Sequence, residues 1–177
     1  MKGLTKYASF LVLFAILSQF GLTQVIYYPY YGKNKVLYEK FEWSHYQTEH
    51  FDIYYYVQDI QLLKNIAEMA ESAYQRLSQT LKHQLSATVP LIYYRTSTDF
   101  EQTNLFQIPE GVLGVAEPIL YRVVIQGDMA LDEIQDLIEH ELTHIFEYDL
   151  LWGSPGGALY SVRQPPGWIM EGFAEYN

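Results

Sequence analysis

The sequence predicts an α+β fold, in which a long helix covers a small mixed β-sheet. Short runs rich in Tyr, Ile and Val, at Phe51–Val57, Ala87–Arg95 and Leu120–Gln126, have the length and composition of strands. Two longer stretches, Asp59–Leu85 and Leu131–Tyr148, instead carry apolar residues every three or four positions, as amphipathic helices do. Because 49% of the 177 residues are hydrophobic, the chain is also large enough to bury one core.

The helix over Asp59–Leu85 is expected to cover the sheet. Its apolar residues form a single stripe that consists of Leu63, Ile66, Ala70, Ala73, Leu77 and Leu81. The strand at Phe51–Val57 precedes this helix, and the strand at Ala87–Arg95 follows it. Proline gives no N–H to a strand ladder, so we expect Pro90 near the start of its strand or at an edge of the sheet.

The middle of the chain predicts a short helix and two more strands. Ser97–Phe106 is expected to form the helix, opened by a Ser or Thr cap. Gly111–Glu117 and Leu120–Gln126 have strand composition and are separated by a proline, while residues 24–48 predict an irregular approach to the domain. A Gly-Asp turn then leads into the next helix.

Two helices are predicted in the last part of the chain. The first, Leu131–Tyr148, has a buried stripe made of Ile134, Ile138, Leu142 and Ile145. The Gly- and Pro-rich stretch Trp152–Gly167 is expected to be a loop, and the last helix begins near Trp168. Because that helix has not ended at Asn177, we expect the C-terminal helical part to be truncated and a further C-terminal domain to follow in the full-length protein.

Composition excludes several classes of function. With 21 acidic and 11 basic residues, the chain has a formal net charge of −10, which argues against binding to nucleic acid or to anionic lipid. Cysteine is absent, so there is neither a disulfide nor a thiolate ligand, and any metal must be held by His and carboxylates. The histidines at His45, His50 and His83 fit no common zinc spacing and are expected to be surface or partly buried residues.

The amino terminus predicts export. Lys2 and Lys6 give a positive start to the chain, and the apolar run Ala8–Leu17 is too short for a comfortable membrane span. Residues 1–23 are therefore expected to be a secretory signal peptide, after whose cleavage the protein would not associate with a membrane. An uncleaved signal anchor is the alternative.

The strongest chemical motif is the run His140-Glu141-Leu142-Thr143-His144 in a predicted helix. Positions i and i+4 lie on one face of a helix, so the two imidazoles can reach a single metal ion. Glu141 projects beside the first histidine and can act as a general base on a metal-bound water without being a ligand. The alternative is an accidental match on an exposed acidic helix.

A second motif, WIMEGFAEY, runs from Trp168 to Tyr176. A catalytic zinc site has three protein ligands and one open position, so Glu171 would complete a set with the two histidines. Alternatively, Glu171 is an ordinary acid near a helix N-terminus, where the helix dipole favours negative charge. Glu175 lies one turn further on and could accept a hydrogen bond from a ligand histidine, which would fix its tautomer.

Together, HELTH and WIMEGFAEY resemble the motifs of the gluzincin, or peptidase MA-like, zinc metallopeptidases, which include thermolysin-like enzymes and zinc aminopeptidases. The resemblance implies a zincin-like catalytic domain over residues 49–177, with Zn²⁺ held by His140, His144 and Glu171. Glu171 follows His144 by 27 positions, farther than in the aminopeptidases. The Tyr or His with which such enzymes stabilise the oxyanion would lie beyond the end of this sequence.

By this resemblance the protein is expected to be a secreted metallopeptidase that hydrolyses peptide bonds with a zinc-activated water and Glu141 as general base. An extended peptide or protein substrate would pair with the strand Gly111–Glu117. Glu117 would then either meet the free amine of a substrate or be a solvated carboxylate at the strand end.

Two other functions stay open. The first is a non-catalytic exported surface module that keeps the zincin fold for binding, although a structural site has no need of the intact Glu141. The second is a zinc hydrolase that acts on a non-peptide bond. Because it would use the same metal ligands, the sequence does not separate it from a peptidase.

Overall fold

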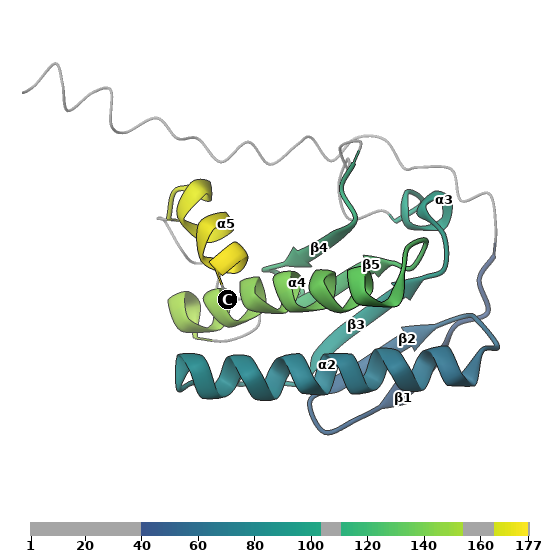
Figure 1. Cartoon of the computed structure of the whole chain (residues 1–177), viewed down its shortest axis with the longest axis horizontal. Coiled ribbons are helices and arrows are strands. Elements are labelled where there is room, and N and C mark those ends of the chain that lie inside the picture. The colour runs from purple at the N-terminus through teal and green to yellow at the C-terminus, as the bar shows by residue number, and fades with distance from the viewer. Residues whose placement is uncertain (1–39, 104–110, 154–164, 177) are drawn as a thin grey trace, which may run out of the picture. The chain divides into compact units, whose positions relative to one another are not determined.

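Five strands in the described part of the chain form one mixed sheet (Figure 1). They are β1 (Ser44–Gln47), β2 (Phe51–Tyr55), β3 (Val89–Tyr94), β4 (Gly114–Glu117) and β5 (Arg122–Gln126). Their spatial order is β1-β2-β3-β5-β4, with antiparallel outer pairs and parallel inner pairs. The computed structural model describes residues 40–103, 111–153 and 165–176, which belong to one compact unit from Asn34 to Asn177.

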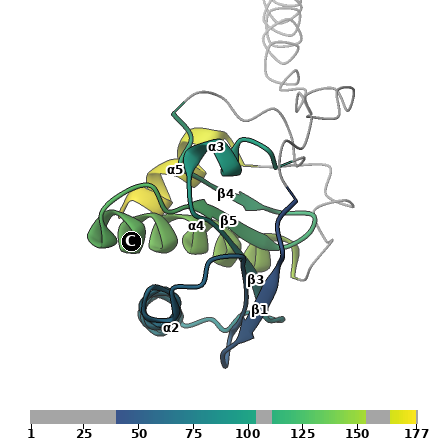
Figure 2. The same ribbon diagram turned by 90° about the vertical axis from the view of Figure 1, so that its right-hand side faces the viewer.

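Four helices accompany the sheet within these described ranges: α2 (Ile60–Leu81), α3 (Ser97–Phe100), α4 (Leu131–Trp152) and α5 (Gly167–Tyr176). The two long helices, α2 and α4, lie side by side against one face of the sheet, as both views show (Figures 1 and 2). This combination of a mixed sheet with packed helices confirms the predicted α+β class.

Strand alternation divides the apolar side chains between the two faces of the sheet. The main core lies between the sheet and the long helices, and its strand residues include Leu91, Tyr93, Val123 and Ile125. A smaller cluster on the opposite face contains Tyr94, Val124 and, from α3, Phe100. The predicted stripes of both helices are buried in the main core, except that Leu81 is only partly buried. The helical periodicity therefore identified the correct faces.

Local signals at the helix ends explain where the long helices begin and stop. The carboxylate of Asp59 accepts a hydrogen bond from the amide of Leu62 (3.0 Å), which satisfies a free N–H at the start of α2. Helix α4 stops at Gly153, whose left-handed backbone (φ 79°) closes the last turn. The predicted end at Tyr148 and loop start at Trp152 were therefore wrong, because the glycine is the stop signal.

Residues 44–47, predicted to be part of an irregular approach, instead form strand β1. All four residues are exposed, so no buried alternation marks the strand in the sequence. It forms by antiparallel pairing with β2, in which Tyr46 lies opposite Ile53. The predicted signal peptide, residues 1–23, and the rest of the approach to residue 39 lie outside the described residues.

Two finer predictions, on the place of Pro90 and on the short helix, can be compared with β3 and α3. β3 is the middle strand of the sheet, so the alternative that placed Pro90 at an edge was wrong. Pro90 is instead the second residue of the strand, near its start. Helix α3 is shorter than predicted and is opened by Thr96, whose hydroxyl accepts a hydrogen bond from the amide of Asp99 (3.1 Å).

Helix α4 is the element that connects the sheet to the last helix. It packs against β4 and β5 on one side and against α5 on another (Figure 1). β4 is the final strand of the described sheet and begins at Gly114, three residues later than predicted. The middle turns of α4 therefore lie between an end strand and α5, where the two sequence motifs meet.

Candidate metal centre

Helix α4 presents His140 and His144 one turn apart on the same face. Their ring centroids are 5.0 Å apart, and the ring planes are nearly perpendicular, at 89°. The side chain of His144 is only 8% exposed, whereas that of His140 is 29% exposed. The pair is thus set at the boundary between the core and the surface beside α5.

Glu171 of α5 faces this histidine pair. Its Oε2 lies 3.6 Å from Nε2 of His140 and 3.7 Å from Nε2 of His144. One candidate ligand atom from each of the three residues lies within 4.8 Å of the others. Among the residues that the structure describes, no other group of three or more His, Asp or Glu side chains meets this condition. The structure therefore brings together the three predicted ligands from two separate helices.

The geometry of this group is compatible with a divalent metal ion. Two ligand atoms that each lie about 2.1 Å from a tetrahedral zinc ion are roughly 3.4 Å apart, close to the distances that Glu171 makes with both histidines. The two distances exceed this separation only slightly. The Glu171 side chain is 68% exposed, so it is free to move closer to the histidines by this difference. Imidazole and carboxylate ligands suit zinc but also other divalent transition metals, so the donor set alone does not specify the ion.

Glu147 is a further residue of this centre, and the sequence analysis missed it. Nδ1 of His144 lies 2.7 Å from Oε2 of Glu147, and both side chains are 8% exposed. A proton on Nδ1 is donated to Glu147, which leaves Nε2 free for a metal. Burial alone lowers the pKa of His144, but the hydrogen bond to Glu147 and the charges of Glu141, Glu147 and Glu171 raise it more. The signal in the sequence was the three-residue spacing of an acid after a ligand histidine.

Glu175, the predicted partner of a ligand histidine, lies beside His140. Its Oε2 is 3.8 Å from Nδ1 of that ring, which is longer than a hydrogen bond. The Glu175 side chain is also 84% exposed. The close carboxylate partner in this structure is therefore Glu147 on His144, and Glu175 is a neighbour of His140 without a hydrogen bond to it.

Glu141, the predicted general base, is buried beside the histidines with 7% of its surface exposed. Burial raises its pKa to about 7, while His144 and the backbone of Ala116 act in the opposite direction and Glu171 adds to the rise. A carboxyl group with a pKa near neutrality can both accept and return a proton at physiological pH. The electrostatic surroundings of Glu141 therefore suit an acid–base role.

Tyr148 joins the centre to the end strand of the sheet. Its ring stacks on that of His144, with centroids 6.2 Å apart and an angle of 15°, and on that of Trp152 (5.4 Å, 16°). Its hydroxyl donates a hydrogen bond to the carbonyl oxygen of Ala116 in β4 (3.3 Å). Burial and the neighbouring carboxylates raise the pKa of Tyr148, so the hydroxyl keeps its proton at neutral pH.

Glu117, at the end of β4, has a cation beside it. The Nε of Arg122 donates a hydrogen bond to Oε2 of Glu117 (2.7 Å), and the two side chains are 24% and 15% exposed. The two residues face each other across the antiparallel pair of β4 and β5. Glu117 is therefore an ion-paired, largely buried carboxylate, which differs from the solvated group that the sequence suggested.

The other described histidines lie outside the centre. Nδ1 of His50 is 2.7 Å from Glu71 of α2, and Nε2 of His83 is 2.7 Å from Asp149. His45 is exposed on the outer strand β1. The expectation that these three are surface or partly buried residues is confirmed.

Asp149 is a third buried carboxylate of α4, placed near the end of the helix. Its Oδ1 accepts hydrogen bonds from the hydroxyls of Tyr121 and Ser86, both at 2.6 Å, and Oδ2 lies 2.7 Å from Nε2 of His83. Burial alone raises the pKa of Asp149, but these hydrogen bonds together bring it below its usual value. The network ties the end of α4 to the segment that follows α2 and to the turn between β4 and β5.

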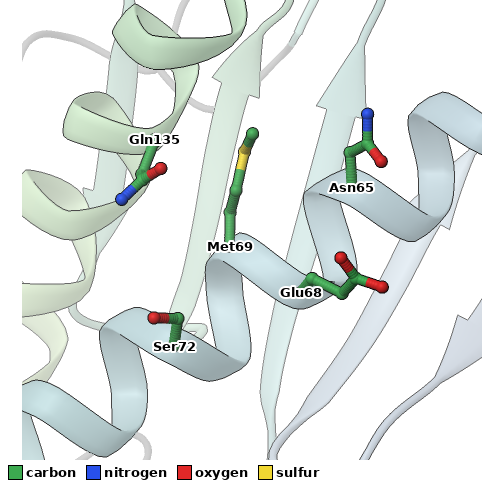
Figure 3. A pocket seen from close by; sticks show the side chains of 5 residues that line it. All are labelled: Asn65, Glu68, Met69, Ser72 and Gln135. Atoms are coloured by element: carbon green, nitrogen blue, oxygen red, sulfur yellow. The ribbon is translucent and has the colours of Figure 1, made fainter.

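A shallow cavity of about 350 Å³ lies on another part of the surface, between α2 and α4 (Figure 3). It is lined by Asn65, Glu68, Met69, Ser72 and Gln135. Gln135 precedes His140 by five positions, which is about 140° round the helix, so the cavity opens on a different face of α4. Its lining has a single carboxylate and no imidazole, so this cavity lacks the histidine ligands that the predicted chemistry needs.

Comparison of the chain with protein-family models, with curated proteins and with solved structures gives no match. The resemblance to gluzincins therefore stays a prediction from the two sequence motifs. Within the described residues, none of the helices combines the length and the apolar character needed to cross a lipid bilayer.

Proposed function

We propose that this chain is a secreted, zinc-dependent metallopeptidase of the gluzincin type. The observation that carries the proposal is the convergence of His140, His144 and Glu171 from two helices beside Glu141, which is buried and has its pKa raised to about 7. A purely structural metal site has no need of a buried acid at this place. The proposed signal peptide over residues 1–23 supports export.

Different residues of the chain have different roles in the proposed hydrolysis. Zinc, when bound, polarises a carbonyl group and lowers the pKa of water. Glu141 accepts the proton of the attacking water and returns it to the leaving amine. Glu147 holds His144 with Nε2 towards the metal through the contact at Nδ1. The role of Glu141 depends on its burial, and that of Glu147 depends on its contact with His144.

We propose that the substrate is an extended peptide or protein segment that pairs with β4. Within the described residues, β4 pairs with β5 on one side only, so its other edge is available for backbone hydrogen bonds. The tie from Tyr148 to Ala116 keeps this strand against α4 and the metal centre. Because Glu117 is already paired with Arg122, we expect no requirement for a free substrate amine. The acidic charge makes nucleic acid an unsuitable partner.

The first test is the zinc content of the purified chain, measured by elemental analysis after removal of loosely bound metal. We expect one zinc per chain, lost in both His144→Ala and Glu171→Ala. His45→Ala is the matched control, because His45 is exposed on β1 and should leave the content unchanged. A folded wild-type chain without zinc would overturn the proposal.

The second test is hydrolysis of fluorescently labelled casein by the zinc-loaded full-length protein. We expect cleavage that is abolished by a chelator and restored by added zinc. Stoichiometric zinc without any peptide cleavage would overturn the peptidase proposal. It would leave the alternatives of an exported binding module or a hydrolase of another bond.

A further inference from the structure

Gly114, the first residue of β4, lies directly against the proposed general base. An ideal Cβ built at this position would be 3.0 Å from both Cγ and Oε1 of Glu141, and 2.9 Å from Cδ1 of Leu137. Favourable contacts between such heavy atoms lie at about 3.5–4.0 Å. Any side chain at this position would therefore press on Glu141.

The backbone does not explain why this residue is a glycine. The described glycines with positive φ are Gly111 and Gly153, and Gly114 is not among them. Gly114 is in regular strand conformation, paired with Ile125 of β5, where an alanine would fit the backbone well. The need for glycine arises from the space that Glu141 and Leu137 occupy.

We propose that Gly114 is a positioning residue, whose missing side chain allows β4 to close over Glu141 and sets the place of its carboxylate. This inference rests on the proposed function. Glu141 is only 7% exposed, so an added methyl group cannot simply push its carboxylate into solvent. Leu137 can adjust more easily, because the contact is with the end of a partly buried side chain.

A shift of the Glu141 carboxylate is expected to lower the rate, because catalytic sites tolerate only small displacements of their reacting groups. Relief of two contacts at 3.0 Å moves the carboxylate by a few tenths of an ångström. Catalytic groups must be held within about 0.5 Å of the productive geometry, and a displacement near 1 Å can cost about 100-fold in rate. We therefore expect Gly114→Ala to affect turnover and to leave the metal ligands in place.

The kinetic experiment compares Gly114→Ala with Gly167→Ala in the zinc-loaded full-length protein. A Cβ at Gly167 meets no described atom within 4 Å, so this variant is the matched control. We expect both variants to bind one zinc. For Gly114→Ala, kcat for casein should fall roughly 3- to 10-fold with KM within about twofold, whereas Gly167→Ala should keep both values.

A double-mutant cycle separates positioning from a general structural effect. In a Glu141→Gln background, whose rate is already low, Gly114→Ala should cause little further loss, because the charged base is no longer there to be displaced. The double variant Gly114→Ala/Leu137→Ala removes the other close contact. It should keep the kinetic defect even where the single variant is less stable.

A spectroscopic experiment tests the contact without zinc or activity. The side-chain carboxyl carbon of Glu141 is observed by ¹³C NMR in the zinc-free chain and assigned by its loss in Glu141→Gln. We expect Gly114→Ala to shift this signal and Gly167→Ala to leave it in place. An unchanged signal together with an unchanged kcat would overturn the role of Gly114, with the proposed function intact. Absence of zinc or activity in the wild-type full-length protein would instead overturn the proposed function, and the NMR result would still decide whether Gly114 places Glu141.

Discussion

Helix α4 carries three buried carboxylates, and two of them, Glu141 and Asp149, have opposite surroundings. They are almost equally buried, with 7% and 4% of their surfaces exposed. Burial raises the pKa of Glu141 to about 7, and few groups nearby stabilise its charge. Burial also raises the pKa of Asp149, but hydrogen bonds with Ser86, Tyr121 and His83 together bring it below its usual value.

The difference shows that burial alone does not fix the state of a carboxyl group. A buried charge is stable when several donors surround it, as they do around Asp149, and it then contributes to holding the fold together. A buried carboxyl with few donors, such as Glu141, is costly to ionise and is able to exchange a proton near neutral pH. We therefore assign a structural role to Asp149 and propose a chemical one for Glu141.

The largest expected effect comes from Glu141→Gln. General acid–base catalysis contributes about 10²–10⁴-fold, so we expect kcat for casein to fall by that factor with the zinc content unchanged. The stability of the zinc-free chain at neutral pH should not decrease, because the change removes a carboxyl that is costly to ionise. A variant that keeps more than about a tenth of the wild-type kcat would remove Glu141 from the role of base.

The matched change at the other carboxylate, Asp149→Asn, should act on stability. The amide replaces a charged acceptor and leaves buried donors with a weaker partner, so we expect the free energy of unfolding to fall by about 1.5–3 kcal/mol. Urea denaturation measures this loss, and zinc content should stay at the wild-type level. Unchanged stability combined with lost zinc would contradict the division between the two carboxylates.

A third change, Glu147→Gln, tests the buried partner of a ligand histidine. Loss of such a partner typically weakens metal binding by about 10- to 100-fold, which competition with a chelator would measure. Glu175→Gln is the comparison, and we expect it to have the smaller effect, because that side chain is 84% exposed and has no hydrogen bond to His140. The reverse order of effects would show that Glu175 is the more important partner.

The smallest expected effect is the pH dependence of the Asp149 contribution. The folded pKa of Asp149 lies below the unperturbed value of 3.8, so its stabilising effect is complete above that value and is lost as the pH falls through the folded pKa. We expect the difference in unfolding free energy between wild type and Asp149→Asn to be constant between about pH 5 and 7 and to shrink below about pH 4. A difference that grows as the pH falls would contradict this assignment.

The fold class and most elements could be predicted because their signals are local. The stripe of α2 and the alternation of β3 reflect residues that are buried on one side, and the sequence displays both directly. Strand β1 was missed because all of its residues are exposed and only its pairing with β2 makes it a strand. The end of α4 was misplaced because residues 149–152 continue the helix as far as Gly153.

The candidate site follows the same rule. His140, Glu141 and His144 are fixed by helical spacing, so their mutual placement could be predicted from the sequence. The place of Glu171 depends on the packing of α5 against α4, which the sequence motif only implied. The Asp149 network could not be predicted, because its partner Ser86 is 63 residues away in the chain.

The third proposed ligand sits on the least anchored of the elements around the centre. Of the residues of α5, only Ala174 is buried, and Trp168 is 76% exposed. The histidine pair is complete as soon as α4 has packed, whereas Glu171 joins only when α5 docks. Under the proposed function, the free energy of zinc binding is therefore also docking free energy for α5. The ion would act as a cross-link, so that the supply of metal decides whether the last helix is fastened to the domain.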